Sequence, residues 1–112
     1  MLKVQDIING LKLNVFTDGN GHDREVSNGY TSDLLSDVIG HADAGMIWIT
    51  LQTHKNVAAV ATLKDLAAVL LINGCKPDED MLAHAREEGI PVLGSDEAAF
   101  EVSGKLYQLL NN

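Results

Sequence analysis

In the second half of the chain, short apolar runs alternate with segments whose apolar residues recur at helical spacing. The runs are apolar almost throughout, which is typical of strands that helices cover on both faces. They span residues 46–51, 67–72 and 90–93. The helical segments span residues 57–63 and 78–88, and a last one carries Ala99, Val102, Leu106 and Leu109 on one face. This alternation predicts a three-layer α/β/α domain with right-handed crossovers and a largely parallel sheet of about five strands.

The first half of the chain adds one short helix and two extended segments. The helix ends near Gly10, and its apolar face consists of Val4, Ile7, Ile8 and Leu11. Residues 13–16 and 25–30 have the composition of strands, and a glycine-containing polar turn at 18–23 separates them. We expect these two segments to form either a hairpin or two separate strands, at a mixed edge of the sheet.

A further helix is predicted to begin after residue 32. Thr31 or Ser32 is suited to cap it, and Asp33 in the first turn would face the positive end of the helix dipole. Gly40 lies near its end. The apolar residues that we expect to form its buried stripe are Leu34, Leu35, Val38 and Ile39.

Composition favours a soluble single domain and excludes several classes of partner. A length of 112 residues and a hydrophobic content of 46% fit one soluble domain, residues 1–112. Sixteen acidic against eight basic residues give a net charge of -8, which repels nucleic-acid phosphates and anionic membranes. No apolar stretch approaches the ~20 residues of a membrane span. The single cysteine excludes an internal disulfide and fits a cytoplasmic protein. We therefore expect no nucleic-acid or membrane partner.

Polar side chains gather in the loops that follow the predicted strands. In an open α/β sheet such loops meet at the carboxyl edge, where helix N-termini offer free N–H groups. The loop at 50–56 is the richest, and the others are 29–32, 73–77 and 94–96. A small anionic ligand, a nucleotide or a phosphate-type group, is the predicted occupant. The candidate contacts are Thr50, Gln52, Thr53, His54, Asn73 and Ser95. In a purely structural alternative, Thr53 caps a helix while His54 and Lys55 are solvated.

No residue pattern predicts a metal site. The polar turn that begins at Asp18 has some likeness to a calcium loop, but position twelve, which needs a carboxylate, is Gly29. We therefore expect residues 18–23 to form a flexible polar turn. The histidines show no paired ligand spacing; they are His22, His41, His54 and His84. We expect neither a metal nor another cofactor.

Catalysis has little support among the residues. Cys75 lies beside Lys76, but no second cysteine or fixed base accompanies it, so a structural thiol is the better prediction. Ser95 lies in no nucleophile elbow, and no phosphate-binding loop with its lysine occurs. Trp48 lies at the centre of an apolar run, so we expect it in the core, with a dimer interface as the alternative.

The order and spacing of several segments resemble the DRTGG domain family, whose members are small α/β domains. The resemblance extends over nearly the whole chain. The segments are DREVSNGY at 23–30, SDLL at 32–35, WITLQTH at 48–54, VAAVA at 57–61, NGCKP at 73–77 and EGIPVL at 88–93. Many family members carry Thr-Gly-Asp-Arg after the central strand, where this chain has residues 50–54. The resemblance therefore implies no particular ligand.

What the resemblance implies is a regulatory or ligand-sensing module without established catalysis. The chain is similar to the N-terminal domain of HPr kinase/phosphorylase, and such domains also occur beside CBS domains. Because the resemblance covers the whole length, we expect a stand-alone domain without the catalytic half of that kinase.

Three functions are therefore open at the level of the sequence. The first is a non-catalytic regulatory or ligand-sensing domain that acts as a homodimer. The second is an adaptor that docks onto a larger redox partner of hydrogenase type, or onto a kinase, through an exposed apolar patch including Trp48 or Tyr107. The third is a small enzyme with His54 as base or Cys75 as nucleophile, which requires a pocket with a positioned second group.

Overall fold

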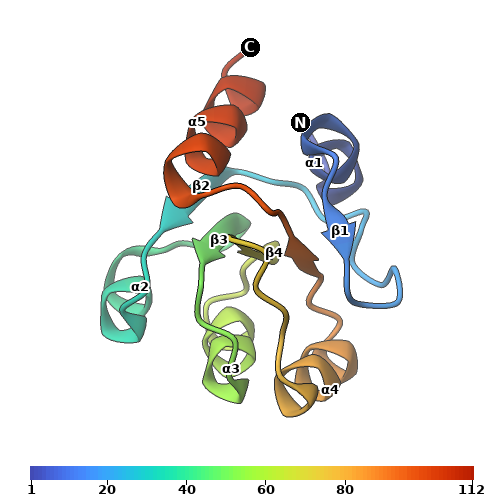
Figure 1. Ribbon diagram of the computed structural model, residues 1–112, viewed down its shortest axis with the longest axis vertical. Helices are drawn as coiled ribbons and strands as arrows, with labels where there is room; N and C mark the ends of the chain where they lie inside the picture. Colours follow the sequence, from blue (N-terminus) through green and yellow to red (C-terminus); the bar gives the residue numbers. More distant parts are fainter.

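The computed structural model describes residues 1–112 and consists of one five-stranded sheet between two layers of helices (Figure 1). The layer below the sheet in Figure 1 is formed by α2, α3 and α4, and the opposite layer by α1 and α5. None of these helices is long and apolar enough to cross a membrane. The predicted three-layer α/β/α fold is confirmed. In chain order the elements are α1 (Val4–Leu11), β1 (Asn14–Val15), β2 (Asn28–Thr31), α2 (Leu35–His41), β3 (Met46–Thr50), α3 (Lys55–Leu63), β4 (Ala68–Leu71), α4 (Glu79–Glu88), β5 (Val92–Gly94) and α5 (Ala99–Leu110).

The sheet is parallel except at one edge. Its strand order is β1-β5-β4-β3-β2, and β1 pairs antiparallel with β5 while the other pairs are parallel. The hairpin alternative for the first two strands is wrong, because β1 and β2 lie at opposite edges. The segment before β2 bonds instead to the start of α1, where the N–H groups of Val4 and Gln5 donate to the carbonyls of Arg24 and His22, both at 2.9 Å.

Alternate residues of the central strands enter two separate cores. Ile47 and Ile49 belong to the core beneath α1 and α5, whereas Trp48 belongs to the core beneath α2, α3 and α4. The Trp48 side chain is fully buried, and its Nε1 donates to the carbonyl of Ser32 at 2.8 Å. The core prediction for Trp48 is therefore confirmed. A dimer interface or docking patch that includes Trp48 is wrong, because no part of the residue reaches the surface.

Helix α1 packs its apolar face onto the sheet, as the sequence predicts. Val4 and Ile7 are fully buried. The helix ends at Leu11, and the C-cap residue Lys12, whose backbone is left-handed with φ of 54°, turns the chain into β1. The end of α1 also lies directly against α5, since a Cβ built on Gly10 would stand 2.8 Å from Cδ2 of Leu109. These contacts hold α1 against the C-terminal helix.

Helix α2 is less buried than its sequence predicts. It begins at Leu35, and Val38 is its one buried residue. Leu34 is 63% exposed and Ile39 is 41% exposed, so the prediction that both are buried is wrong. The reason is position: α2 lies at the end of its layer, beside the edge strand β2 (Figure 1), so only one side of it meets the protein.

Candidate functional site

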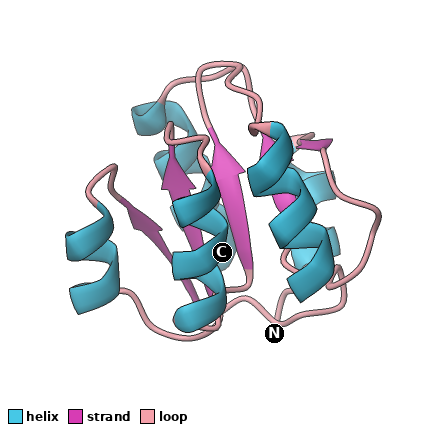
Figure 2. Ribbon diagram, turned by 90° about the horizontal axis from the view of Figure 1, so that it is seen from below, coloured by secondary structure: helices cyan, strands magenta, loops and turns pink.

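All six candidate contacts lie at the carboxyl edge of the sheet. Because β2 to β5 run in the same direction, the loops that follow them meet at that edge (Figure 2). Thr50 ends β3, Asn73 follows β4, and Ser95 follows β5. The six residues differ in how many hydrogen bonds their polar side-chain atoms already form within the chain.

Thr50 and Gln52 are bonded to Asp33, in the loop between β2 and α2. The Thr50 hydroxyl donates to Asp33 Oδ1 at 2.8 Å and accepts the N–H of Gln52 at 3.2 Å. Gln52 Nε2 donates to the carbonyl of Asp33 at 3.2 Å. Thr50 is the one buried polar residue of the chain. Its hydroxyl therefore joins two loops and has no hydrogen to offer to a ligand.

Thr53 and His54 lie between β3 and α3. The Thr53 hydroxyl donates to Asp78 Oδ1 at 3.3 Å, and the N–H of Asp78 donates to the carbonyl of Thr53 at 2.9 Å, so this loop is tied to the start of α4. His54 is the N-cap residue of α3, but its imidazole makes no cap bond. The half-buried His54 ring is thus the freer of the two side chains.

Asn73 and Ser95 belong to two loops that bond to each other. The N–H of Asn73 donates to the carbonyl of Glu97, and the N–H of Gly74 to that of Ser95, both at 2.9 Å. Asn73 has a left-handed backbone with φ of 57°, and its side chain is exposed. The Ser95 hydroxyl accepts the N–H of Glu97 at 3.1 Å. Ser95 is therefore held firmly beside the start of α5.

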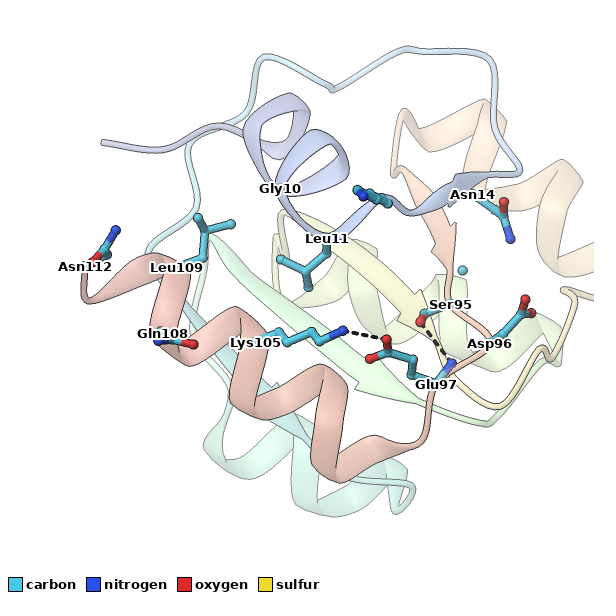
Figure 3. A pocket seen from close by; sticks show the side chains of 12 residues that line it. Gly10, Leu11, Asn14, Ser95, Asp96, Glu97, Lys105, Gln108, Leu109 and Asn112 are labelled. Atoms are coloured by element: carbon cyan, nitrogen blue, oxygen red, sulfur yellow. Dashed lines mark hydrogen bonds and ion pairs between the residues drawn. The ribbon is translucent and has the colours of Figure 1, made fainter.

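A cavity of about 720 Å³ opens beside Ser95 (Figure 3). One wall comes from the end of α1 and from β1, and the other from the end of β5 and from α5. The two walls are far apart in the sequence and are brought together by the packing of α1 on α5. The lining residues are Gly10, Leu11, Lys12, Asn14, Gly94, Ser95, Asp96, Glu97, Lys105, Gln108, Leu109 and Asn112.

The cavity is polar, and its charges are only partly paired. Lys105 Nζ lies 2.5 Å from Glu97 Oε1, which neutralises both groups. Figure 3 shows Lys105 reaching from α5 toward Glu97, with Leu11 descending from α1 on the other side. The side chains of Lys12 and Asp96, by contrast, form no hydrogen bond or ion pair within the chain. The cavity therefore offers one free cation and one free carboxylate to a ligand.

A second polar cluster lies at the opposite edge of the sheet, around Asp37. Tyr30 Oη donates to Asp37 Oδ2 at 2.8 Å, and His41 Nδ1 lies 3.1 Å from Asp37 Oδ1. Hydrogen bonds from Ser32 and Tyr30 hold the pKa of Asp37 below its usual value of 3.8. The bond to Asp37 raises the pKa of Tyr30 above 10.0. This cluster fastens α2 to β2, and the cavity does not include it.

The chain shares its fold with a regulatory protein. No family model and no curated protein matches the sequence. Among solved structures, it is similar to the CBS and DRTGG domains of the regulatory region of Clostridium perfringens pyrophosphatase, complexed with the activator diadenosine tetraphosphate. The TM-score is 0.78 at 13% sequence identity. The chain has a DRTGG-like fold. The match covers 95% of this chain and 46% of that chain, so the DRTGG-like domain spans less than half of the pyrophosphatase region.

Of the residues that line the cavity of the DRTGG-like domain, Ser95 is the only one that the sequence predicts as a ligand contact. The loops after β2, β3 and β4 carry the other candidates, whereas the cavity lies beyond β5 and is closed by α1 and β1. One signal is present in the sequence: Lys105, Gln108 and Asn112 recur at helical spacing beside the apolar face of α5. A solvated helix face has the same pattern, so this signal alone identifies no site.

The DRTGG-like domain shows no positioned catalytic pair at His54 or at Cys75. Neither the imidazole of His54 nor the thiol of Cys75 forms a hydrogen bond within the chain, and neither residue lines the cavity. Cys75 is partly buried and packs against the core beneath α3 and α4. No group of three or more His, Cys, Asp or Glu side chains is arranged to hold a metal ion.

Proposed function

We propose that this chain is a cytoplasmic, non-catalytic regulatory domain that senses a small ligand at the carboxyl edge of its sheet. The observation that carries the proposal is the cavity of about 720 Å³ beside Ser95. Small-molecule sites in proteins have volumes of about 300–1,000 Å³. The DRTGG-like fold supports a regulatory role, because a regulatory region of a pyrophosphatase shares it.

The ligand in this proposal carries an anionic group of phosphate or nucleotide type. The net charge of -8 means that an anion must be bound locally. Lys12 supplies an unpaired cation, and Ser95 lies beside it in the cavity, three residues before the N-cap residue Ala98 of α5. A ligand that extends along the edge would next meet Asn73, then Thr53, His54 and Gln52. We keep these four residues as predicted outer contacts, and Thr50 as a structural support for them.

Isothermal titration against nucleotides and small phosphates tests the proposal. Binding is expected, and Lys12→Gln should weaken it, whereas Lys64→Gln, which removes an equal charge outside the cavity, should not. Loss of affinity in Thr53→Ala and His54→Ala would assign the outer contacts. If no small ligand binds, and Thr53→Ala and His54→Ala leave cellular function intact, the ligand-sensing role is wrong.

An adaptor role is the second candidate, and two exposed aromatic residues favour it. Phe100 is 85% exposed and Tyr107 is 68% exposed. They are seven residues apart in α5 and therefore lie on one face of that helix. The same face is suited to a homodimer, which we propose as the working state of the domain. Docking onto a redox or kinase partner would use this face instead.

Light scattering and co-purification separate these two uses of α5. A homodimer is expected for the wild-type chain at micromolar concentration, and Phe100→Ser with Tyr107→Ser should yield a monomer. If the wild-type chain is already monomeric and a redox or kinase protein from the native host is retained only by the wild type, the adaptor role replaces the homodimer.

A further inference from the structure

The charges that line the cavity restrict which ligands it can accept. Glu97 already neutralises Lys105, with 2.5 Å between Oε1 and Nζ. One cation, Lys12, and one carboxylate, Asp96, remain without partners among the lining residues. A ligand with several negative charges would meet a single free cation, a free carboxylate and an overall charge of -8. A ligand with one negative and one positive group would pair with both.

The uncharged lining residues favour a small polar body between those two groups. Asn14, Gln108 and Asn112 carry amides that form no hydrogen bond within the chain, and each amide can both donate and accept. Leu11 and Leu109 are the only apolar side chains of the lining, one from each wall. The cavity thus offers hydrogen bonds over most of its surface and a narrow apolar contact where the walls face each other (Figure 3).

We propose that the ligand is a small zwitterion, whose anionic group pairs with Lys12 and whose ammonium group pairs with Asp96. Free amino acids and aminoalkyl phosphates such as phosphoethanolamine both have this chemistry. The inference rests on the proposed ligand-sensing role of the same cavity. Phosphoethanolamine keeps the phosphate-type group of that proposal, whereas a free amino acid replaces it with a carboxylate. Asp96 is the residue that determines specificity, since it separates zwitterions from simple anions of equal size.

Matched probes isolate the two charges of the ligand. The first probes are free amino acids and two kinds of derivative with the same side chains. The N-acetyl derivatives lack the ammonium group, and the amides lack the carboxylate. Phosphoethanolamine, inorganic phosphate and adenosine monophosphate complete the set. Each is titrated into the isotope-labelled full chain, and amide chemical shifts of Lys12, Asn14, Ser95 and Gln108 report binding in the cavity.

Free amino acids or phosphoethanolamine are expected to shift these amides, and whichever binds identifies the anionic group. The N-acetyl derivatives and the amides should bind at least about fivefold more weakly. Lys12→Gln and Asp96→Asn should each weaken binding similarly. Lys64→Gln and Asp43→Asn, which remove the same charges from positions outside the cavity, should leave it unchanged.

Two results would overturn the inference, and only the second would also overturn the proposed ligand-sensing function. If phosphate, adenosine monophosphate or an N-acetyl amino acid shifts the cavity amides as strongly as any zwitterion, and Asp96→Asn has no effect, the zwitterion class is wrong while ligand sensing stands. If no probe shifts these amides, the cavity is not a ligand site and both proposals fail.

Discussion

The buried hydroxyl of Thr50 donates to the carboxylate of Asp33, and this bond joins the end of β3 to the loop before α2. The two oxygens are 2.8 Å apart, and the same Asp33 oxygen accepts the N–H of Leu51 at 3.0 Å. Thr50→Val preserves the shape of the side chain but removes the donor. We expect it to lower the free energy of unfolding by about 1–2 kcal/mol, measured by urea denaturation.

Thr53→Val is the matched control for Thr50→Val. The Thr53 hydroxyl donates at 3.3 Å to Asp78, which is exposed, so its loss should cost less than about 0.5 kcal/mol. If Thr50→Val costs no more than Thr53→Val, the bond between Thr50 and Asp33 is not a structural support. Thr50 would then return to the set of ligand contacts.

The hydrogen bonds that Asp37 receives from Ser32 and from Tyr30 make stability depend on pH at both extremes. Asp37 has a lowered pKa in the folded state, so its contribution is present above its usual value of 3.8 and is lost as pH falls through the lower folded pKa. Tyr30 has a raised pKa, so its contribution is complete below 10.0 and is lost as pH rises through the raised folded value.

Tyr30→Phe removes the shared hydrogen bond, so it should reduce the pH dependence of the melting temperature in both the acid and the alkaline range. Melting curves between pH 2 and pH 11 measure this. Tyr107→Phe is the control, because that phenol is 68% exposed and forms no hydrogen bond in the chain. Equal pH profiles for the two variants would show that Asp37 and Tyr30 titrate independently.

The three layers and the parallel sheet can be predicted from the sequence, because they depend on the pattern of apolar residues within short segments. A run such as Met46–Thr50 is apolar at every position but its last, and both of its faces are indeed covered, by α1 and α5 on one side and α3 on the other. Gly89 likewise ends α4 in a left-handed conformation with φ of 69°, as a glycine after a helix predicts.

Two features could not be predicted in this way: the pairing of β1 with β5, and the cavity. Both depend on contacts between residues that are far apart in the sequence. Asn14 pairs with Gly94, eighty residues later, and no local pattern distinguishes that partner from β2. The same pairing brings Lys12 beside the loop of Ser95. Leu34 shows the converse: its apolar side chain fits a buried stripe, but the edge position of α2 leaves it in solvent.

Gly21 is expected to tolerate no side chain. Its φ is 84°, and an added Cβ would lie 2.6 Å from the carbonyl oxygen of Gly89, a backbone atom that cannot move aside without shifting the end of α4. Gly21→Ala should therefore destabilise the domain by more than about 2 kcal/mol. Gly19 has a φ of 96° but no atom within 4 Å of its Cβ position, so Gly19→Ala should cost only the conformational strain of about 1 kcal/mol. Chemical denaturation of the two variants compares them, and equal costs would show that the loop shifts freely at Gly21.

Gly104→Ala should stabilise an isolated chain. Gly104 lies inside α5 with no atom within 4 Å of its Cβ position, and alanine is favoured over glycine in a helix by about 1 kcal/mol. The melting temperature should therefore rise, whereas Gly29→Ala, whose Cβ would lie 2.8 Å from Cδ2 of Leu106, should lower it.

Gly104 also lies between Phe100 and Tyr107 on the exposed face of α5. If a second copy of the chain packs closely on that face, the added methyl group weakens the dimer. Gly104→Ala then raises stability at low protein concentration and lowers it at high concentration, so melting curves over a hundredfold range of concentration distinguish a free helix face from a dimer interface.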